Sequence, residues 1–197
     1  MILSDGDIKK HLAAGDILIE DFDEARLQPA SYDVLLGTDF LVYDHQNLSV
    51  IDPREDISKF MRKVIVPNDG HFVLQAGEFA LGMVADFVGV GPEYAIELMG
   101  KSSLARLGLI IHTTAGFIDP GNQLNVTLEL FNTNKVAIKL YPGMKIAQIC
   151  FRKLSSPAEK PYGTKGLNSK YFNARTVQAS AMHKNFKKPQ KDDKKNK

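Results

Sequence analysis

The stretch Asn125-Val126-Thr127-Leu128-Glu129-Leu130 decides the fold class, because its even positions are all apolar and its odd positions are all polar. Side chains of a β-strand point alternately to its two faces, so this pattern predicts a half-buried strand with Glu129 on the polar face. Downstream, residues 136–141 and 144–151 flank Pro142-Gly143, a pair that favours a type II turn. The sequence therefore predicts a β-hairpin after the first strand.

Upstream, short apolar runs are separated by Gly, Pro, Asn and Asp at the spacing of roughly 8 to 12 residues that is typical of β-sandwiches and barrels. The runs are residues 17–19, 32–36, 40–43, 64–66, 72–74, 79–84 and 88–90. One capped helix is expected between Ser4 and Gly15, since acidic residues follow the serine and the glycine suits a left-handed stop. We therefore expect an all-β protein with a few short helices.

Composition sets the class of protein. The chain has 197 residues, of which 44% are hydrophobic and 24% are charged, and this is enough for one buried core. No apolar run reaches the ~18 to 20 residues of a membrane span, and the first residues lack the basic and apolar regions of a secretory signal. A cytoplasmic protein with no membrane partner is expected. Cys150 is the single cysteine, which excludes an intrachain disulfide, and its apolar surroundings predict a buried, inert thiol.

Charge is unevenly distributed along the chain. Residues 184–197 carry seven lysines against two aspartates, a net charge of +5, whereas the whole chain has a net charge of +2. The remaining residues therefore have a net charge of −3. Such an acidic body does not indicate a nucleic-acid groove, and no nucleic-acid partner is expected. We expect residues 184–197 to form a solvated, disordered tail, with attachment to nucleic acid as the minor alternative.

Residues 100–109, Gly-Lys-Ser-Ser-Leu-Ala-Arg-Leu-Gly-Leu, contain the most unusual motif. The two serines suit a helix N-cap and the second glycine suits a C-terminal stop, which predicts one or two helical turns. Lys101 and Arg106 on such a helix make an anion site reasonable, although a capped surface helix with exposed cations explains the same residues. A Walker A loop is excluded because Ala95 stands where that pattern requires glycine.

The next segment, residues 112–121, is predicted to be a loop, because Asp119-Pro120-Gly121 is a turn former and Gly116 allows close approach of the backbone. His112 ends an apolar run and is more typical of a strand histidine than of a catalyst. The chain has no His-Glu-x-x-His spacing and no paired cysteines. Zinc hydrolases and zinc-dependent base deaminases are therefore poorly supported, and hydrolysis is expected to use carboxylates, hydroxyls and water.

The order and spacing of these motifs closely resemble those of the dCTP deaminases in the trimeric dUTPase superfamily. The motifs are Lys101-Ser102-Ser103-Leu104-Ala105-Arg106-Leu107-Gly108, His112-Thr113-Thr114-Ala115-Gly116-Phe117-Ile118-Asp119-Pro120-Gly121, Thr127-Leu128-Glu129-Leu130, Tyr141-Pro142-Gly143-Met144-Lys145-Ile146-Ala147-Gln148, Ser169-Lys170-Tyr171 and Gln28-Pro29-Ala30-Ser31-Tyr32-Asp33-Val34. The resemblance implies a single dUTPase-like deaminase domain over residues 1–183, a distorted β-barrel or jelly-roll that assembles as a homotrimer. Residues 155–183 would form an arm that closes over the site.

The resemblance further implies deamination at C4 of cytosine without a metal on the protein. Glu129 would act as general base and acid, taking a proton from water and passing it toward N3 and the leaving ammonia. Ser102 and the backbone carbonyl of Ala115 would position that water. Arg106 would keep the Glu129 carboxylate ionised and oriented, because a guanidinium favours the charged form of a neighbouring acid.

A larger set of residues is implied in nucleotide binding. It comprises Lys101, Ser102, Ser103, Leu104, Ala105, Arg106, Asp119, Thr127, Leu128, Glu129, Gln148, Tyr162 and Lys170. Asp119 would lie near the sugar, the cations and hydroxyls would hold the phosphates, and Mg²⁺ would arrive on the triphosphate of dCTP or dUTP. The sequence departs from the family at Ala174, where glutamine is common, and Arg175 or Gln178 could replace that contact.

Gly116-Phe117 bears on the choice between two activities. A glycine and an aromatic residue at this place resemble the bifunctional branch that also cleaves dUTP to dUMP and pyrophosphate, supplying dUMP for thymidylate synthesis. The alternatives are a monofunctional deaminase that releases dUTP and ammonia, and a non-catalytic nucleotide-binding trimer on the same fold. A pure dUTPase is poorly supported, because residues 160–197 contain only Gly163 and Gly166 instead of a glycine-rich motif.

Overall fold

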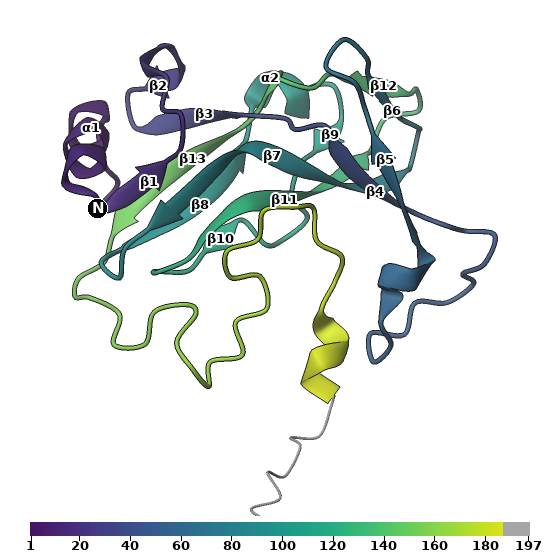
Figure 1. Cartoon of the computed structure of the whole chain (residues 1–197). Helices are drawn as coiled ribbons and strands as arrows, with labels where there is room; N and C mark the ends of the chain where they lie inside the picture. The colour runs from purple at the N-terminus through teal and green to yellow at the C-terminus, as the bar shows by residue number, and fades with distance from the viewer. Residues whose placement is uncertain (187–197) are drawn as a thin grey trace, which may run out of the picture.

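The computed structural model describes residues 1–186 and consists mostly of antiparallel strands (Figure 1). In the larger sheet the order is β5 (Met61–Ile65), β4 (Asp39–Tyr43), β7 (Phe79–Val90), β11 (Gln123–Asn132) and β9 (Leu109–Ile110), and β1 (Ile17–Ile19) pairs with β7. In the second sheet it is β10 (Phe117–Ile118), β8 (Tyr94–Gly100), β13 (Lys145–Lys153), β3 (Ser31–Leu35) and β2 (Leu27–Gln28). A third sheet contains β12 (Ile138–Leu140) and β6 (Phe72–Leu74). The predicted all-β class is confirmed.

Helical structure is short. Within residues 1–186 it comprises α1 (Asp5–Ala14), α2 (Ser102–Ala105) and three 3₁₀ turns, η1 (Glu24–Arg26), η2 (Ile57–Phe60) and η3 (Met182–Phe186). The helix α1 has the predicted ends: the Ser4 side chain accepts a hydrogen bond from the Asp7 N–H, and Gly15 adopts φ 77°. None of the helices within residues 1–186 is long and apolar enough to span a bilayer.

One hydrophobic core contains side chains from both large sheets. Leu128 and Leu130 of β11 are fully buried, as the alternating pattern predicted, and Ile149 and Phe151 of β13 contribute from the other sheet. Because these strands place every second side chain in the core, their remaining side chains stay available at the surface or in cavities. Glu129 is one of these and is half-buried.

The expectation of separate strands at residues 79–84 and 88–90 is wrong, because β7 runs without a break from Phe79 to Val90. The polar residue in the gap, Asp86, is 8% exposed and accepts a hydrogen bond from Arg26 Nη1 at 2.6 Å. Arg26, 60 residues away in the sequence, therefore compensates the buried charge of Asp86, so a polar residue at this position does not end the strand.

The predicted hairpin around Pro142-Gly143 is also wrong. The turn itself forms, with Gly143 at φ 78° and the Met144 N–H donating to the Tyr141 carbonyl at 3.2 Å. The strands on its two sides belong to different sheets, since β12 pairs with β6 while β13 pairs with β3 and β8. The turn thus connects two sheets.

Residues 155–181 contain no strand or helix and run past the ends of β10 and β11, as Figure 1 shows in yellow-green. Backbone hydrogen bonds join this arm to the body, from Tyr162 N–H to the Pro120 carbonyl and from Asn125 N–H to the Ala174 carbonyl, both at 2.8 Å. The turn η3 extends into the predicted tail as far as Phe186. The rest of that tail, residues 187–197, lies outside the described residues.

Candidate active site

A cavity of about 630 Å³ lies between β11, the loop before β10 and the arm. Six of the residues implied by the resemblance line it, and these are Ala115, Phe117, Asp119, Thr127, Glu129 and Tyr162. The loop and β11 come from neighbouring parts of the sequence, whereas the arm returns from about 40 residues further along the chain, as its lining residues Tyr171, Ala174, Gln178, Ser180 and Met182 show. The cavity therefore depends on the arm lying across the strand.

Glu129 is the only carboxylate of β11 and is placed on this cavity by the alternation of the strand. Its neighbours Leu128 and Leu130 point into the core, so the Glu129 side chain points the other way. Its Oε2 accepts a hydrogen bond from the Thr113 N–H at 3.1 Å. This bond ties the carboxylate to the loop that contains Ala115, and no other hydrogen bond to it occurs within residues 1–186.

Hydrogen bonds hold the arm over the cavity. The Gln178 N–H donates to Thr127 Oγ1 at 3.1 Å, and the Tyr171 N–H donates to the Tyr162 hydroxyl at 3.1 Å. The Tyr171 hydroxyl in turn accepts the Ala181 N–H at 2.9 Å. The arm is therefore ordered by its own tyrosines and by one threonine of β11.

The structure shows which residue near Ala174 could replace the glutamine that is common in the family at this position. Arg175, one candidate replacement, points away from the cavity, because its guanidinium pairs with Glu20 at 2.5 Å and stacks on the Phe87 ring at 3.3 Å. Ala174 and Gln178 both line the cavity. Of the two suggested replacements, only Gln178 is therefore placed to meet a ligand there.

The other implied residues do not line this cavity. They are Lys101, Ser102, Ser103, Leu104, Ala105, Arg106, Leu128, Gln148 and Lys170. Arg106 is exposed and makes no ion pair with Glu129 in the part of the chain that the structure describes. The predicted serine N-cap is wrong, because Lys101 is the N-cap of α2 and makes no side-chain cap bond. Within one chain, Glu129 therefore lies on the cavity without Ser102, the implied water-positioning residue, and without Arg106.

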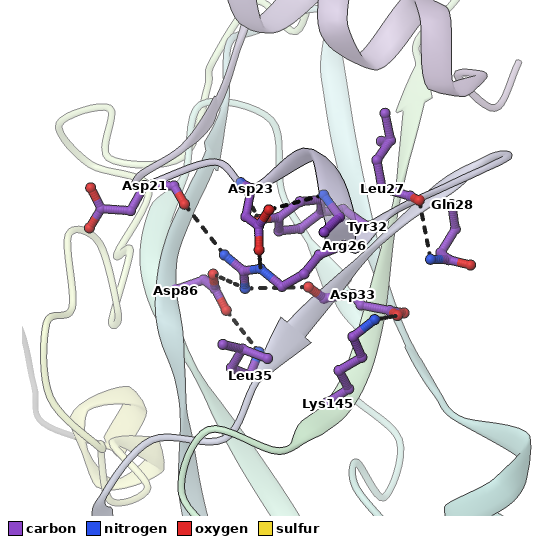
Figure 2. A network of polar contacts seen from close by, with 11 residues as sticks. Asp21, Asp23, Arg26, Leu27, Gln28, Tyr32, Asp33, Leu35, Asp86 and Lys145 are labelled. Carbon is purple, nitrogen blue, oxygen red and sulfur yellow. Dashed lines mark hydrogen bonds and ion pairs between the residues drawn. The ribbon is translucent and has the colours of Figure 1, made fainter. Parts of the chain in front are cut away.

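Lys101 and Gln148 gather instead around a buried carboxylate, Asp33 of β3, which is 2% exposed. Lys101 Nζ lies 2.5 Å from Asp33 Oδ1, and Lys145 Nζ lies 3.2 Å from Oδ2. Gln148 faces Asp33 directly across the β13–β3 ladder, and Ser31 Oγ donates to Gln148 Oε1 at 3.3 Å. Figure 2 shows Asp33 beside Lys145 and near the pair formed by Arg26 and Asp86.

Phe117 lines both this cavity and a second hollow of about 370 Å³, whereas Gly116 lines only the second hollow. The Gly116 carbonyl accepts the Leu98 N–H at 2.7 Å, and a Cβ on Gly116 would stand 2.8 Å from the Leu98 carbonyl oxygen. Gly116 does not adopt a positive φ. Close backbone approach, as predicted, therefore explains the glycine.

Two groups of residues were missed by the sequence reasoning. Tyr43 and Tyr171 line the cavity, and burial raises the pKa of the Tyr43 hydroxyl. Asp33 and Lys145 were also missed, and Asp33 pairs with Lys101, a residue implied in phosphate binding. The signal for Asp33 was available, because a carboxylate inside the apolar run of residues 32–36 requires a partner if that run is a buried strand.

Comparison with known proteins places this architecture. The solved structure of 2′-deoxycytidine 5′-triphosphate deaminase from Agrobacterium tumefaciens shares the fold, with a TM-score of 0.61 and 23% identity over 78% of this chain and 48% of that chain. A family model described as dCTP deaminase-like matches residues 2–154. The chain belongs to the dCTP deaminase-like family.

Sequence relatives share a more specific name. A protein of Beutenbergia cavernae is 47% identical over 94% of this chain and 97% of its own length, and one of Leifsonia xyli subsp. xyli is 48% identical over 94% and 92%. A protein of Bifidobacterium longum is 44% identical over 98% of this chain and 100% of its own length. Each is named "dCTP deaminase, dUMP-forming".

Proposed function

We propose that this protein deaminates dCTP at C4 of cytosine and cleaves the resulting dUTP to dUMP and pyrophosphate. The observation that carries the proposal is the Glu129 carboxylate, which faces a cavity of about 630 Å³ and is tied by hydrogen bond to the loop of Ala115 and Phe117. The names of relatives 44–48% identical over 94–98% of the chain support the same activity.

In the first reaction water adds to C4 and ammonia leaves, so dCTP and water give dUTP and ammonia. Glu129 takes a proton from the attacking water and returns protons to N3 and to the departing amino group. The Ala115 carbonyl and the Ser102 hydroxyl orient the water. Since Glu129 accepts only one hydrogen bond within residues 1–186, its second oxygen is available to the water.

In the second reaction water attacks the α-phosphorus and the bond to the bridging oxygen of the β-phosphate breaks, giving dUMP and pyrophosphate. Gly116 adds no side chain beside Phe117, which lines the cavity together with Asp119 and Glu129, and this leaves room for a second water there. Mg²⁺ enters with the substrate, bound to the triphosphate. It offsets part of the negative charge that approaches a body of net charge −3.

A homotrimer with shared sites completes this mechanism. Ser102 and Arg106 are exposed and do not line the cavity of Glu129 in one chain, so they would meet a Glu129 of another subunit. Exposed apolar side chains next to α2, Leu107 and Ile110, support burial of this surface on association. We further propose that the protein acts in the cytoplasm.

Chromatography of dCTP incubated with the purified protein and Mg²⁺ tests the proposal. We expect dUMP and pyrophosphate with little free dUTP, because an intermediate held in one site is cleaved before release. Stoichiometric dUTP would instead establish the monofunctional deaminase. Binding of dCTP without any turnover would establish the non-catalytic nucleotide-binding trimer.

A further inference from the structure

We propose that Lys145 is a further phosphate-binding residue and that Asp33 is a positioning residue, which holds Lys145 and Lys101 together as one cationic clamp for the phosphates. This inference rests on the proposed function, because the nucleotide triphosphate is the ligand of the clamp. It adds two residues to that site and gives a role to a buried charge that the catalytic mechanism does not use.

The contacts of Asp33 carry the first step. Both of its carboxylate oxygens are used, Oδ1 by Lys101 at 2.5 Å and Oδ2 by Lys145 at 3.2 Å. The Asp33 side chain is 3% exposed, whereas the side chains of Lys101 and Lys145 are 23% and 45% exposed. The carboxylate is therefore withdrawn from solvent, while both ammonium groups can still reach an anion.

The sheet register supplies the second step. Gln148, a residue implied in phosphate binding, lies directly opposite Asp33 in the antiparallel ladder, so the two side chains share one face of the sheet. Lys145 lies three residues before Gln148 on β13, and a register shift between Lys145 and Ala147 places it opposite Leu35, two residues from Asp33 on β3. Lys101 leads into α2 with its serines. Three segments that are distant in sequence thus bring polar and cationic groups to one place.

A second ion pair fixes the backbone behind the clamp (Figure 2). Arg26 Nη1 lies 2.6 Å from Asp86 Oδ1 and 3.5 Å from the Asp33 carbonyl oxygen, and Asp86 Oδ2 accepts the Leu35 N–H at 2.8 Å. The Arg26 guanidinium also lies over the Tyr32 ring at 4.7 Å. Strand β3 is therefore held on both sides of Asp33.

Charge explains why an acid belongs in a phosphate site. Two ammonium groups at one place repel each other, and long lysine side chains lose rotamer freedom when they are fixed. A buried carboxylate between them offsets both effects and still leaves one net positive charge. Clamp residues that are already ordered bind the triphosphate with less loss of entropy than free lysines would.

The experiment compares steady-state kcat and KM for Mg·dCTP in Asp33→Asn and Lys145→Met. We expect KM to rise about 10-fold in Asp33→Asn, in the range for hydrogen bonds to charged groups, and about 5-fold in Lys145→Met. In both variants kcat should stay within about twofold, because the clamp binds phosphate without taking part in proton transfer. Lys145→Arg should restore most of the KM.

The matched control is the pair of Asp39 with Lys63, which lie 3.1 Å apart on β4 and β5 and line neither cavity. Asp39→Asn and Lys63→Met make the same changes of charge and should leave KM unchanged. The double variant of Asp33→Asn with Lys145→Met should have a KM below the product of the two single effects, since Asp33 acts through the lysine.

Several results would overturn the inference. A loss of kcat with unchanged KM in Asp33→Asn would assign it a purely structural role, and a lower KM would mean that the acid competes with phosphate. If Asp33→Asn does not fold, Lys145→Met decides, and an unchanged KM there refutes the clamp. Failure of the unmodified protein to bind or convert dCTP would refute the proposed function itself, which separates the two failures.

Discussion

The Glu129 cavity and the cluster around Asp33 both contain a carboxylate, but the two carboxylates differ in burial and in the number of groups that bind their oxygens. Glu129 is half-buried, faces a cavity and accepts one backbone N–H. Asp33 is 2% exposed and has an ammonium group on each oxygen. A group that must exchange protons needs an oxygen free for water, whereas a group that holds others in place is saturated by them.

Glu129→Gln should have the largest effect on activity. The amide keeps the shape and the acceptor for the Thr113 N–H but cannot take a proton, so deamination should fall by ~10² to 10⁴-fold. Nucleotide binding and circular dichroism should change little, and both are measured on the same preparation. Near-normal turnover in this variant would contradict the assignment of Glu129 as the carboxylate that transfers protons.

Arg106→Ala should be the next most severe, by about 10 to 100-fold in kcat, the range expected for the loss of a charge-assisted hydrogen bond. The effect depends on the shared site, because the Arg106 guanidinium is exposed and pairs with no carboxylate within residues 1–186 of one chain. Light scattering at micromolar concentration should report three chains. A fully active monomer would contradict the shared site.

Mixed trimers test the sharing directly. Ser102→Ala and Glu129→Gln chains are each expected to be inactive alone. When they are dissociated and reassembled together, some sites combine an intact Ser102 with an intact Glu129 from different chains. Partial recovery of dCTP turnover is expected, and mixing two batches of the same variant is the control.

Gly116→His should change the products more than the total rate. Any side chain at this position meets the Leu98 carbonyl, so Gly116→Ala is the matched control for backbone displacement. The imidazole should additionally crowd the second water, so we expect a larger fraction of dUTP relative to dUMP than in Gly116→Ala. Equal fractions in the two variants would assign the effect to the backbone alone.

The smallest expected effect is on stability, and it comes from Cys150, whose thiol is buried on β13. Burial, and next the Glu97 charge, raise the pKa of its thiol. A raised pKa in the folded state stabilises the protein below the unfolded thiol pKa of about 8.5, and this contribution is lost as the pH rises through the folded value. The urea midpoint should therefore fall between pH 8 and 10 slightly more in the unmodified protein than in Cys150→Ala. An equal fall of the urea midpoint with pH in the two proteins would show that the thiol is exposed to solvent.

Part of the cavity lining could be predicted from sequence, because Ala115, Phe117 and Asp119 lie in one short motif and Thr127 and Glu129 in another. The alternation in β11 placed Glu129 on the polar face, and the close approach at Gly116 was expected from the glycine. The partners of these residues could not be predicted in the same way. No local pattern indicates that Gln178 bonds Thr127, 51 residues away, or that Arg175 turns to Glu20.

What the sequence by itself determined is therefore local: the cap of α1, the turn at Pro142-Gly143 and the faces of β11, each of which depends on residues within one turn or one strand. Only the tertiary structure decided that β7 continues through Asp86, that β12 pairs with β6, and that Asp33 holds Lys101. These outcomes depend on contacts across 60 residues for Arg26 with Asp86 and 68 for Lys101 with Asp33. A buried charge or a strand edge is stable only with its partner, and that partner is chosen by the folded chain.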